Sequence, residues 1–289
     1  MITRRFVIRG LLASLLAGLI AASYGFFIEP ALRLRVTRWR LSLPGWTAGP
    51  LRIAILADIH VGAPIVSRRR LRQVVTRTNA LGADLILFLG DLEAGHRFVT
   101  EKVPLADAAA ELAGLDCPLG VYAILGNHDW WHDAAAQTGA PGLPEAGRQL
   151  EAAGIPVLEN EVRRFDGFWL AGLGDQLAYS VSGRGGRDDL PGTLTQAQDD
   201  APVILMAHEP DIFARMPDRV GLTLSGHTHG GQVRIFGFSP LVPSQFGNRY
   251  AYGHVIEDGR HLIVSGGIGC SILPVRLGVV PEITVLELS

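Results

Sequence analysis

Five short, nearly continuous apolar runs in this chain each lead, within three residues, to Asp, His or Asn. The runs are residues 51–57, 85–89, 121–125, 203–206 and 222–224. Stretches with helical spacing follow the first two runs, and the apolar or small positions 71, 74, 75 and 78 are one example. Nearly continuous apolar runs that alternate with helices indicate the buried strands of an α/β fold. Functional groups of such folds gather at the carboxyl ends of the strands, so we expect one shared site there.

The residues at these strand ends are of the types that bind divalent cations: carboxylates, neutral imidazoles and an amide oxygen. A single Asp after a strand would more simply be the N-cap of a helix, but five such ends in order favour a metal site. The candidate ligands are Asp58, His60, Asp91, Asn127, His208, His227 and His229. They are too many for one open catalytic ion, so we expect two ions with Asp91 as the bridging carboxylate. Glycines at 226, 230 and 231 allow a tight loop that turns His227 and His229 toward different ions.

Composition excludes some classes of function. The net charge is -2, so no overall positive field would hold the chain on nucleic acid, and we expect no nucleic-acid partner. The two cysteines, Cys117 and Cys270, form no C-x-x-C pattern and therefore indicate neither a zinc ribbon nor a redox pair.

The N-terminal region has the character of a membrane segment. Residues 10–28 carry no charge, and at 1.5 Å per residue they nearly span a hydrocarbon core of ~30 Å. Arg4 and Arg5, followed by apolar residues and Arg9, resemble a twin-arginine export signal. We expect residues 1–30 to be a signal or anchor, uncleaved rather than removed, and residues 31–289 to form the folded domain.

Arginines stand on both sides of the apolar segment, so counting positive charges does not decide its orientation. Arg33 and Arg35 alternate with Leu32, Leu34 and Val36, which indicates the outer face of a strand that starts here. An exported folded domain would carry these arginines across the membrane. We therefore expect a protein of the bacterial inner membrane with its catalytic domain on the periplasmic side.

The motifs D-x-H, G-D, G-N-H-D, H-x-P and G-H-T-H, in this order over about residues 51–289, resemble those of the calcineurin-like metallophosphoesterases. The resemblance implies a double β-sheet sandwich flanked by helices, here preceded by one hydrophobic helix. It also implies that the first ion is held by Asp58, His60, Asp91 and His229, and the second by Asp91, Asn127, His208 and His227. His128 would stay off both ions, beside the phosphate, where it stabilises the transition state or protonates the leaving oxygen.

A closer resemblance is to the bacterial membrane-anchored branch of phosphodiesterases with twin-arginine signals. The G-H-T-H-G-G-Q motif is followed here by a proline-rich loop at 240–243, Tyr252-Gly253, a glycine-rich turn at 265–269 and P-E-I at 281–283. This implies a hydrolase, most simply a phosphodiesterase, that uses two metal ions and an activated water on a phosphate ester or pyrophosphate. A lipid-linked substrate is one option, and mixed N and O ligands fit Mn, Fe, Zn or Co.

Three alternatives remain open from the sequence. One is a pyrophosphatase like those that cleave UDP-2,3-diacylglucosamine, a lipid A precursor. Another is a catalytically silent, membrane-bound scaffold, whose signature would be missing ligands, and none is missing here. A third is a nuclease, against which the balanced charge and the anchor argue.

Overall fold

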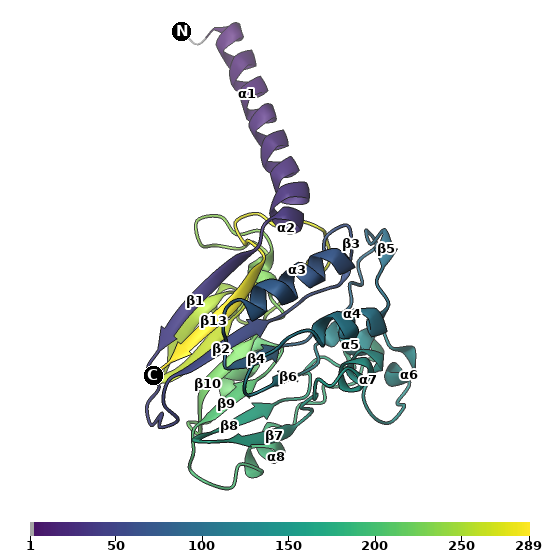
Figure 1. Cartoon of the computed structure of the whole chain (residues 1–289). Helices are drawn as coiled ribbons and strands as arrows, with labels where there is room; N and C mark the ends of the chain where they lie inside the picture. Colours follow the sequence, from purple (N-terminus) through teal and green to yellow (C-terminus); the bar gives the residue numbers. More distant parts are fainter. Residues whose placement is uncertain (1–2) are drawn as a thin grey trace.

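The computed structural model describes residues 3–289 and begins with one long apolar helical segment. It consists of α1 (Arg4–Ser23), a π-helical turn η1 (Tyr24–Ile28) and α2 (Glu29–Leu32). The segment is long and apolar enough to cross a membrane. It projects away from the rest of the chain, and none of the described residues of α1 is buried (Figure 1). The strand expected from Leu32 begins only at Arg35, because the helix continues to Leu32 with Glu29 and Pro30 buried against the domain.

Two β-sheets form the body of the molecule, which confirms the predicted α/β sandwich. The first sheet has the order β1 (Arg35–Leu41), β13 (Glu282–Leu288), β2 (Leu51–Leu56), β4 (Leu85–Phe88), β6 (Val121–Ala123). The second has the order β11 (Gly253–Glu257), β12 (Arg260–Val264), β10 (Val220–Ser225), β9 (Val203–Met206), β8 (Phe168–Gly172), β7 (Glu161–Phe165). A small ribbon pairs β3 (Gly62–Ala63) with β5 (Glu101–Lys102). All five apolar runs of the sequence analysis lie in these two sheets.

Helices cover the outer face of the first sheet. They are α3 (Arg68–Asn79), α4 (Leu105–Leu112) and α7 (Glu145–Ala152) (Figure 1). The remaining short helices are α5 (Asn127–Trp131), α6 (Ala134–Gln137), η2 (Ser180–Ser182), α8 (Leu190–Thr195), η3 (Pro210–Arg215), η4 (His229–Gly231) and η5 (Gly247–Tyr250). Of these, η3 and α8 pack on the outer face of the second sheet.

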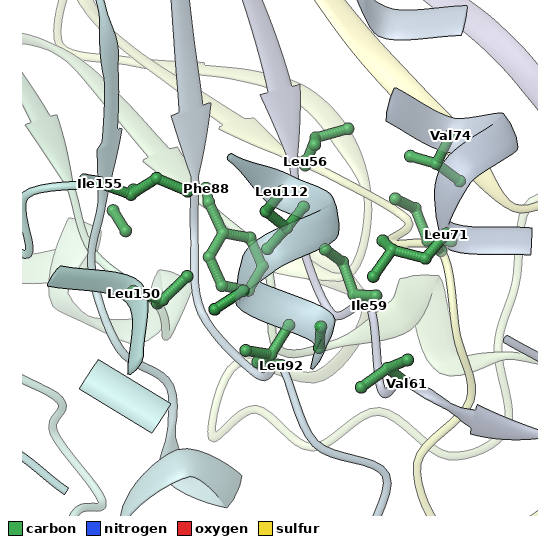
Figure 2. Close-up of a cluster of buried hydrophobic side chains, with 14 of the residues drawn as sticks. Leu56, Ile59, Val61, Leu71, Val74, Phe88, Leu92, Leu112, Leu150 and Ile155 are labelled. Carbon is green, nitrogen blue, oxygen red and sulfur yellow. The ribbon is translucent and has the colours of Figure 1, made fainter. Parts of the chain in front are cut away.

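Alternation along the strands separates the hydrophobic cores. In β2, Ile53 and Ile55 face the second sheet, whereas Ala54 and Leu56 face the helices. Figure 2 shows Leu56 beside Phe88, Leu71 and Leu112 in the layer between the first sheet and the helices. A central strand is apolar wherever both of its faces are buried, which explains the nearly continuous apolar runs in the sequence. Each fully buried side chain of this kind contributes about 1.5–3 kcal/mol.

The strand directions place the predicted site at the edge from which the apolar helix emerges. β1 starts there and is parallel to β13, and β13 is antiparallel to β2. β2 therefore ends at the edge where β1 begins. β4 and β6 end at the same edge, because they run parallel to β2. The loops that carry the candidate ligands therefore lie on the same side of the sandwich as the foot of the helix.

Candidate metal centre

The structure brings all seven predicted ligands together in one buried cluster, with the Asp91 carboxylate in the middle. Asp91 Oδ2 lies 3.5 Å from His60 Nε2 on one side and 3.2 Å from His208 Nε2 on the other. A carboxylate that faces ligand-type nitrogens on two sides has the position that a bridging ligand needs.

The first group of ligands contains Asp58, His60 and His229, whose ligand atoms lie within 4.8 Å of one another. His60 Nε2 and His229 Nε2 are 3.1 Å apart, and His229 Nε2 is 3.5 Å from Asp58 Oδ1. Asp58 and His60 follow β2, whereas His229 follows β10 in the other sheet. The group is therefore assembled only when the two sheets pack together.

On the other side of Asp91 lie Asn127, His208 and His227. His227 Nδ1 is 2.9 Å from Asn127 Oδ1, and the His208 and His227 rings are 5.3 Å apart between centroids. Asp58 also ties this side to the first, because its Oδ1 accepts a hydrogen bond from the backbone N–H of His227 at 2.9 Å.

Partners outside the cluster set which ring nitrogen faces it. His60 Nδ1 is 3.0 Å from the carbonyl oxygen of Glu93, and His208 Nδ1 is 2.6 Å from that of Leu89. A carbonyl can only accept, so in both rings Nδ1 carries a proton and Nε2 is the nitrogen that faces the cluster; in the neutral ring of His60 it presents its lone pair. This is the arrangement of histidines that bind a metal through Nε2.

Burial and charge also fit a divalent cation. Burial lowers the pKa of His60 to about 3 and that of His229 well below its usual value, so both rings are neutral. Burial raises the pKa of Asp58 to about 7. For Asp91, burial alone would raise the pKa, but positive charge on His208 holds it well below the usual range. Both imidazoles of the first side are thus neutral, and Asp91 is anionic, as the ligands of a divalent cation must be.

Two buried ligand atoms of the cluster are unsatisfied within residues 3–289, namely Asp58 Oδ2 and His208 Nε2. Buried polar atoms without partners cost free energy, on the order of 1–3 kcal/mol each. Two such atoms beside facing imidazole nitrogens are the donor set of a cation site, and the residues therefore fit divalent metal ions.

The backbone at the cluster is unusual, because five of the seven candidates have positive φ. The values are 48° for Asp58, 44° for His60, 60° for Asp91, 66° for His227 and 51° for His229. Left-handed backbone costs a non-glycine residue about 1–2 kcal/mol. Such strain is found where the position of a side chain matters for function.

The sequence matches the family described as "Calcineurin-like phosphoesterase" over residues 51–231, which is more than half of the chain. This chain belongs to the calcineurin-like phosphoesterases. It is therefore a hydrolase that acts on phosphoric esters, in a family that uses divalent metals, which confirms the enzyme class predicted from the motifs.

Two bacterial relatives match this phosphoesterase over nearly their whole length. The chain is 28% identical to the metallophosphoesterase YkuE of Bacillus subtilis, over 99% of this chain and 98% of the relative. It is 30% identical to the phosphodiesterase YaeI of Escherichia coli, over 94% of this chain and 96% of the relative. A bovine transmembrane protein with metallophosphoesterase domain is 31% identical over 83% of this chain, which spans about half (53%) of that protein.

His128, the predicted catalytic residue of this phosphoesterase, lies at the side of the cluster and, like His227, is partly exposed, whereas the other ligand candidates are buried. Its backbone N–H donates to Asp91 Oδ1 at 2.8 Å, which fixes the residue against the predicted bridge. Its ring reaches Ser271, with Nε2 3.2 Å from Oγ, and His132, with Nδ1 3.3 Å from Nε2. Burial lowers the pKa of His128, so the ring is neutral at pH 7 and carries one N–H.

Sequence reasoning missed two supporting residues of the phosphoesterase site. Asp129 accepts hydrogen bonds from the backbone N–H groups of Asp91, Leu92 and Gly126. Its place in the G-N-H-D motif was the available signal. Arg276 is completely buried, and its Nη2 lies 3.1 Å from His229 Nδ1. No local pattern marks Arg276, because its role depends on a contact between residues 47 positions apart.

A buried carboxylate pair next to the cluster was also missed. Asp175 follows β8, so the apolar run at 168–173 repeated the strand-end pattern that identified the other candidates. It lies beside Glu209, whose Oε2 accepts from the backbone N–H of Gln176 at 3.1 Å. Burial and the charge of Glu209 raise the pKa of Asp175 well above its usual value. Glu209 also shares a potential ligand group with His208 and His227.

Proposed function

We propose that this protein is a phosphodiesterase with two divalent ions, held at a membrane by residues 1–30, with the phosphoesterase domain in residues 31–289. The first ion would be held by Asp58, His60, Asp91 and His229, and the second by Asp91, Asn127, His208 and His227. The position of the Asp91 carboxylate between His60 Nε2 and His208 Nε2 carries this proposal. Mn, Fe, Zn and Co all suit this mixture of nitrogen and oxygen ligands.

When bound, such ions lower the pKa of a water and neutralise the charge that develops on the phosphoryl group. The residues of the chain supply position and hydrogen bonds. His128 is fixed at the cluster by its backbone bond to Asp91, and its Nε2 faces Ser271 Oγ across 3.2 Å. A neutral imidazole with the proton on Nε2 would donate a hydrogen bond to a phosphoryl oxygen or to the leaving oxygen there.

A diester is the preferred substrate class because YaeI, which matches nearly the whole chain, is named a phosphodiesterase. A pyrophosphate linked to a lipid, as in UDP-2,3-diacylglucosamine, is the second candidate, and the apolar N-terminal helix favours it. The complete set of ligand residues argues against a silent scaffold. For the compartment, we propose the bacterial inner membrane with the domain on the periplasmic side, from the twin-arginine pattern at Arg4 and Arg5.

The test uses the full-length chain in detergent, stripped with chelator and resupplied with Mn²⁺. We expect hydrolysis of bis-p-nitrophenyl phosphate to exceed that of p-nitrophenyl phosphate, with two bound ions per chain by elemental analysis. Asp91→Asn should abolish turnover and lower the metal content. Asp107→Asn, which alters an exposed carboxylate paired with Arg68, is the matched control and should do neither. Full metal loading without hydrolysis of either ester would overturn the proposal.

A further inference from the structure

The loop that leads to Arg276 connects the apolar helix with the site. The backbone N–H of Arg276 donates to the carbonyl oxygen of Gly25 in η1 at 2.9 Å, and its side chain reaches His229. Gly25 is buried, and a Cβ at this position would lie 3.3 Å from the carbonyl oxygen of Arg276. Five residues earlier in the same loop, Ser271 contacts His128 at the open side of the cluster. The helix therefore packs against a segment that also borders the site.

Exposed apolar side chains gather on this segment and on the loop beside it. Six of them, which we call the apolar collar, are between 40% and 105% exposed: Ile235, Phe236, Phe238, Leu241, Ile272 and Leu273. The two loops are joined by hydrogen bonds from Arg234 N to the carbonyl oxygen of Leu277 (2.8 Å) and from Gln232 Nε2 to that of Leu273 (3.0 Å). In Figure 1 the green and yellow loops of this region lie beside α2, at the foot of α1. Large apolar side chains exposed together on two joined loops point to an interaction site.

The tip of the collar is a tight turn in which a bulky, exposed residue has a left-handed backbone. Ile235 and Phe238 exchange two backbone hydrogen bonds, of 2.9 and 3.0 Å, around a two-residue turn formed by Phe236 and Gly237. Both turn residues have positive φ, 51° for Phe236 and 81° for Gly237. Glycine suits this backbone, but a bulky residue there is strained. Phe236 is also 105% exposed, so the strained aromatic ring gains no packing within the fold.

Positive charge lies near the foot of the helix as well. α3 presents exposed Arg69, Arg72 and Arg77. The Arg77 guanidinium donates to the carbonyl oxygen of Leu34 at 2.8 Å, just after α2, which places α3 at this edge of the sandwich. Arginines next to a membrane segment favour anionic lipid headgroups, by about 1 kcal/mol each.

We propose that the apolar collar inserts into the headgroup region of the bilayer beside the apolar helix, so that the site opens onto the membrane surface. The occupant of this surface is a lipid bilayer, because the collar continues directly from the helix that is long enough to span one and because arginines border it. Ile272 follows Ser271, the residue that touches His128, so a lipid that carries a phosphate ester would meet the site at the collar. This last step, which names an amphipathic lipid as the substrate class, rests on the proposed phosphodiesterase function.

The first test measures insertion and is independent of catalysis. Full-length protein carrying Cys117→Ala is reconstituted into phosphatidylcholine vesicles with a minority of phosphatidylglycerol and labelled with an environment-sensitive fluorophore at Phe238→Cys. The matched control is Ile256→Cys, because Ile256 is similarly exposed (58% against 62%) but lies near the hairpin end of β11 at the opposite edge. We expect lipids with a headgroup quencher to quench only the label at 238. Equal, weak quenching at both positions would overturn the proposal.

The second test separates the substrate class from the general activity. We expect Phe236→Ser with Phe238→Ser to lower turnover of a fluorescent long-chain phosphodiester in the same vesicles by about tenfold, as a loss of 1.4 kcal/mol implies. Turnover of soluble bis-p-nitrophenyl phosphate should be unchanged. If the wild type cleaves neither ester, the phosphodiesterase function fails while the quenching result still decides insertion. If it cleaves the soluble ester and the variant retains full turnover of the lipid, the lipid-substrate inference fails.

Discussion

Asp129 supports both the fold and the metal cluster. Replacing it beside a matched control should therefore separate the loss of activity from the loss of stability. Its side chain is buried, and its Oδ2 accepts from the backbone N–H groups of Asp91 at 2.8 Å and Gly126 at 3.0 Å. Its Oδ1 accepts from Leu92 N at 2.9 Å. One carboxylate thus joins the loop after β4, which carries Asp91, to the loop after β6, which carries Asn127 and His128.

The expected cost of Asp129→Asn follows from these three bonds. Burial, with the charge of Asp91, raises the pKa of Asp129 to about 6, so the group is ionised at pH 7.5. A hydrogen bond to a charged group contributes about 1.5–3 kcal/mol. Asparagine keeps one acceptor oxygen but turns its NH₂ group toward a backbone donor, so one bond is lost and a donor is left buried. We expect unfolding free energy to fall by about 2–4 kcal/mol.

Turnover should fall further than stability alone explains, because a shift of about 1 Å in a catalytic group can cost about a hundredfold in rate. The matched control is Asp133→Asn. Asp133 also accepts from backbone N–H groups, those of Ala136 at 3.0 Å and Glu145 at 2.8 Å, but it caps α6 outside the metal cluster. Urea unfolding at pH 7.5 should show a lower free energy of unfolding for both variants. Turnover of bis-p-nitrophenyl phosphate should fall only for Asp129→Asn. The reasoning is refuted if Asp129→Asn unfolds within about 0.5 kcal/mol of the wild type or keeps normal turnover.

Three further outcomes are expected. In Gly90→Ala, the added Cβ would lie 2.3 Å from the backbone N of Gly126, and residue 90 has a φ of 92°; the free energy of unfolding, measured in urea, should fall by about 3 kcal/mol. Gly142 also has a positive φ, but a Cβ there would lie in open space. Gly142→Ala should therefore lower the free energy of unfolding by only about 1 kcal/mol. Burial lowers the pKa values of His254 and His261, so below pH 6.5 these two residues bind fewer protons in the native state than in the unfolded chain. The stability that they contribute is therefore present above that pH and is lost as the pH falls through their folded pKa values. Replacing both with Gln should make the melting temperature depend less on pH in the acid range. Mn²⁺ at a hundred times its Kd should raise unfolding free energy by about 2.7 kcal/mol, and calorimetry with and without chelator would show no shift if the cluster bound no ion.

The strands that carry the site could be predicted from sequence because they are buried on both faces. The run at 203–206 coincides with β9, and the run at 51–57 extends one residue beyond β2. A strand covered by a second sheet on one face and by helices or loops on the other must be apolar throughout. The polar residue that ends such a run is then conspicuous, and this made Asp58 and His208 visible as candidates.

What could not be predicted depends on long-range packing. β1 and β13 pair side by side although their partners, such as Arg35 and Glu282, are 247 positions apart, and neither strand's local pattern names the other. Arg276 is buried against His229 for the same reason. The left-handed backbone of Asp58 and Asp91 could not be predicted either, because glycine is the residue usually found in this conformation. An aspartate adopts it only where the surrounding fold holds it there.

Glu282 shows how the fold fixes the site relative to the apolar helix. It is 1% exposed, and its Oε2 accepts from Nε of Arg35 at 3.0 Å, three residues after the end of α2. Its Oε1 accepts from the backbone N–H of Gly266 at 3.0 Å. Gly266 begins the turn in which a Cβ on Gly267 would lie 2.7 Å from the Cβ of Asp58, so this turn packs directly on a candidate ligand. One buried carboxylate therefore connects the first strand after the helix to the loop behind the metal cluster. The helix itself is tied to this region by the hydrogen bond from the backbone N–H of Arg276 to the carbonyl oxygen of Gly25 (2.9 Å), so the domain cannot reorient on its helix without breaking that bond, and the site stays directed toward the edge from which the helix emerges.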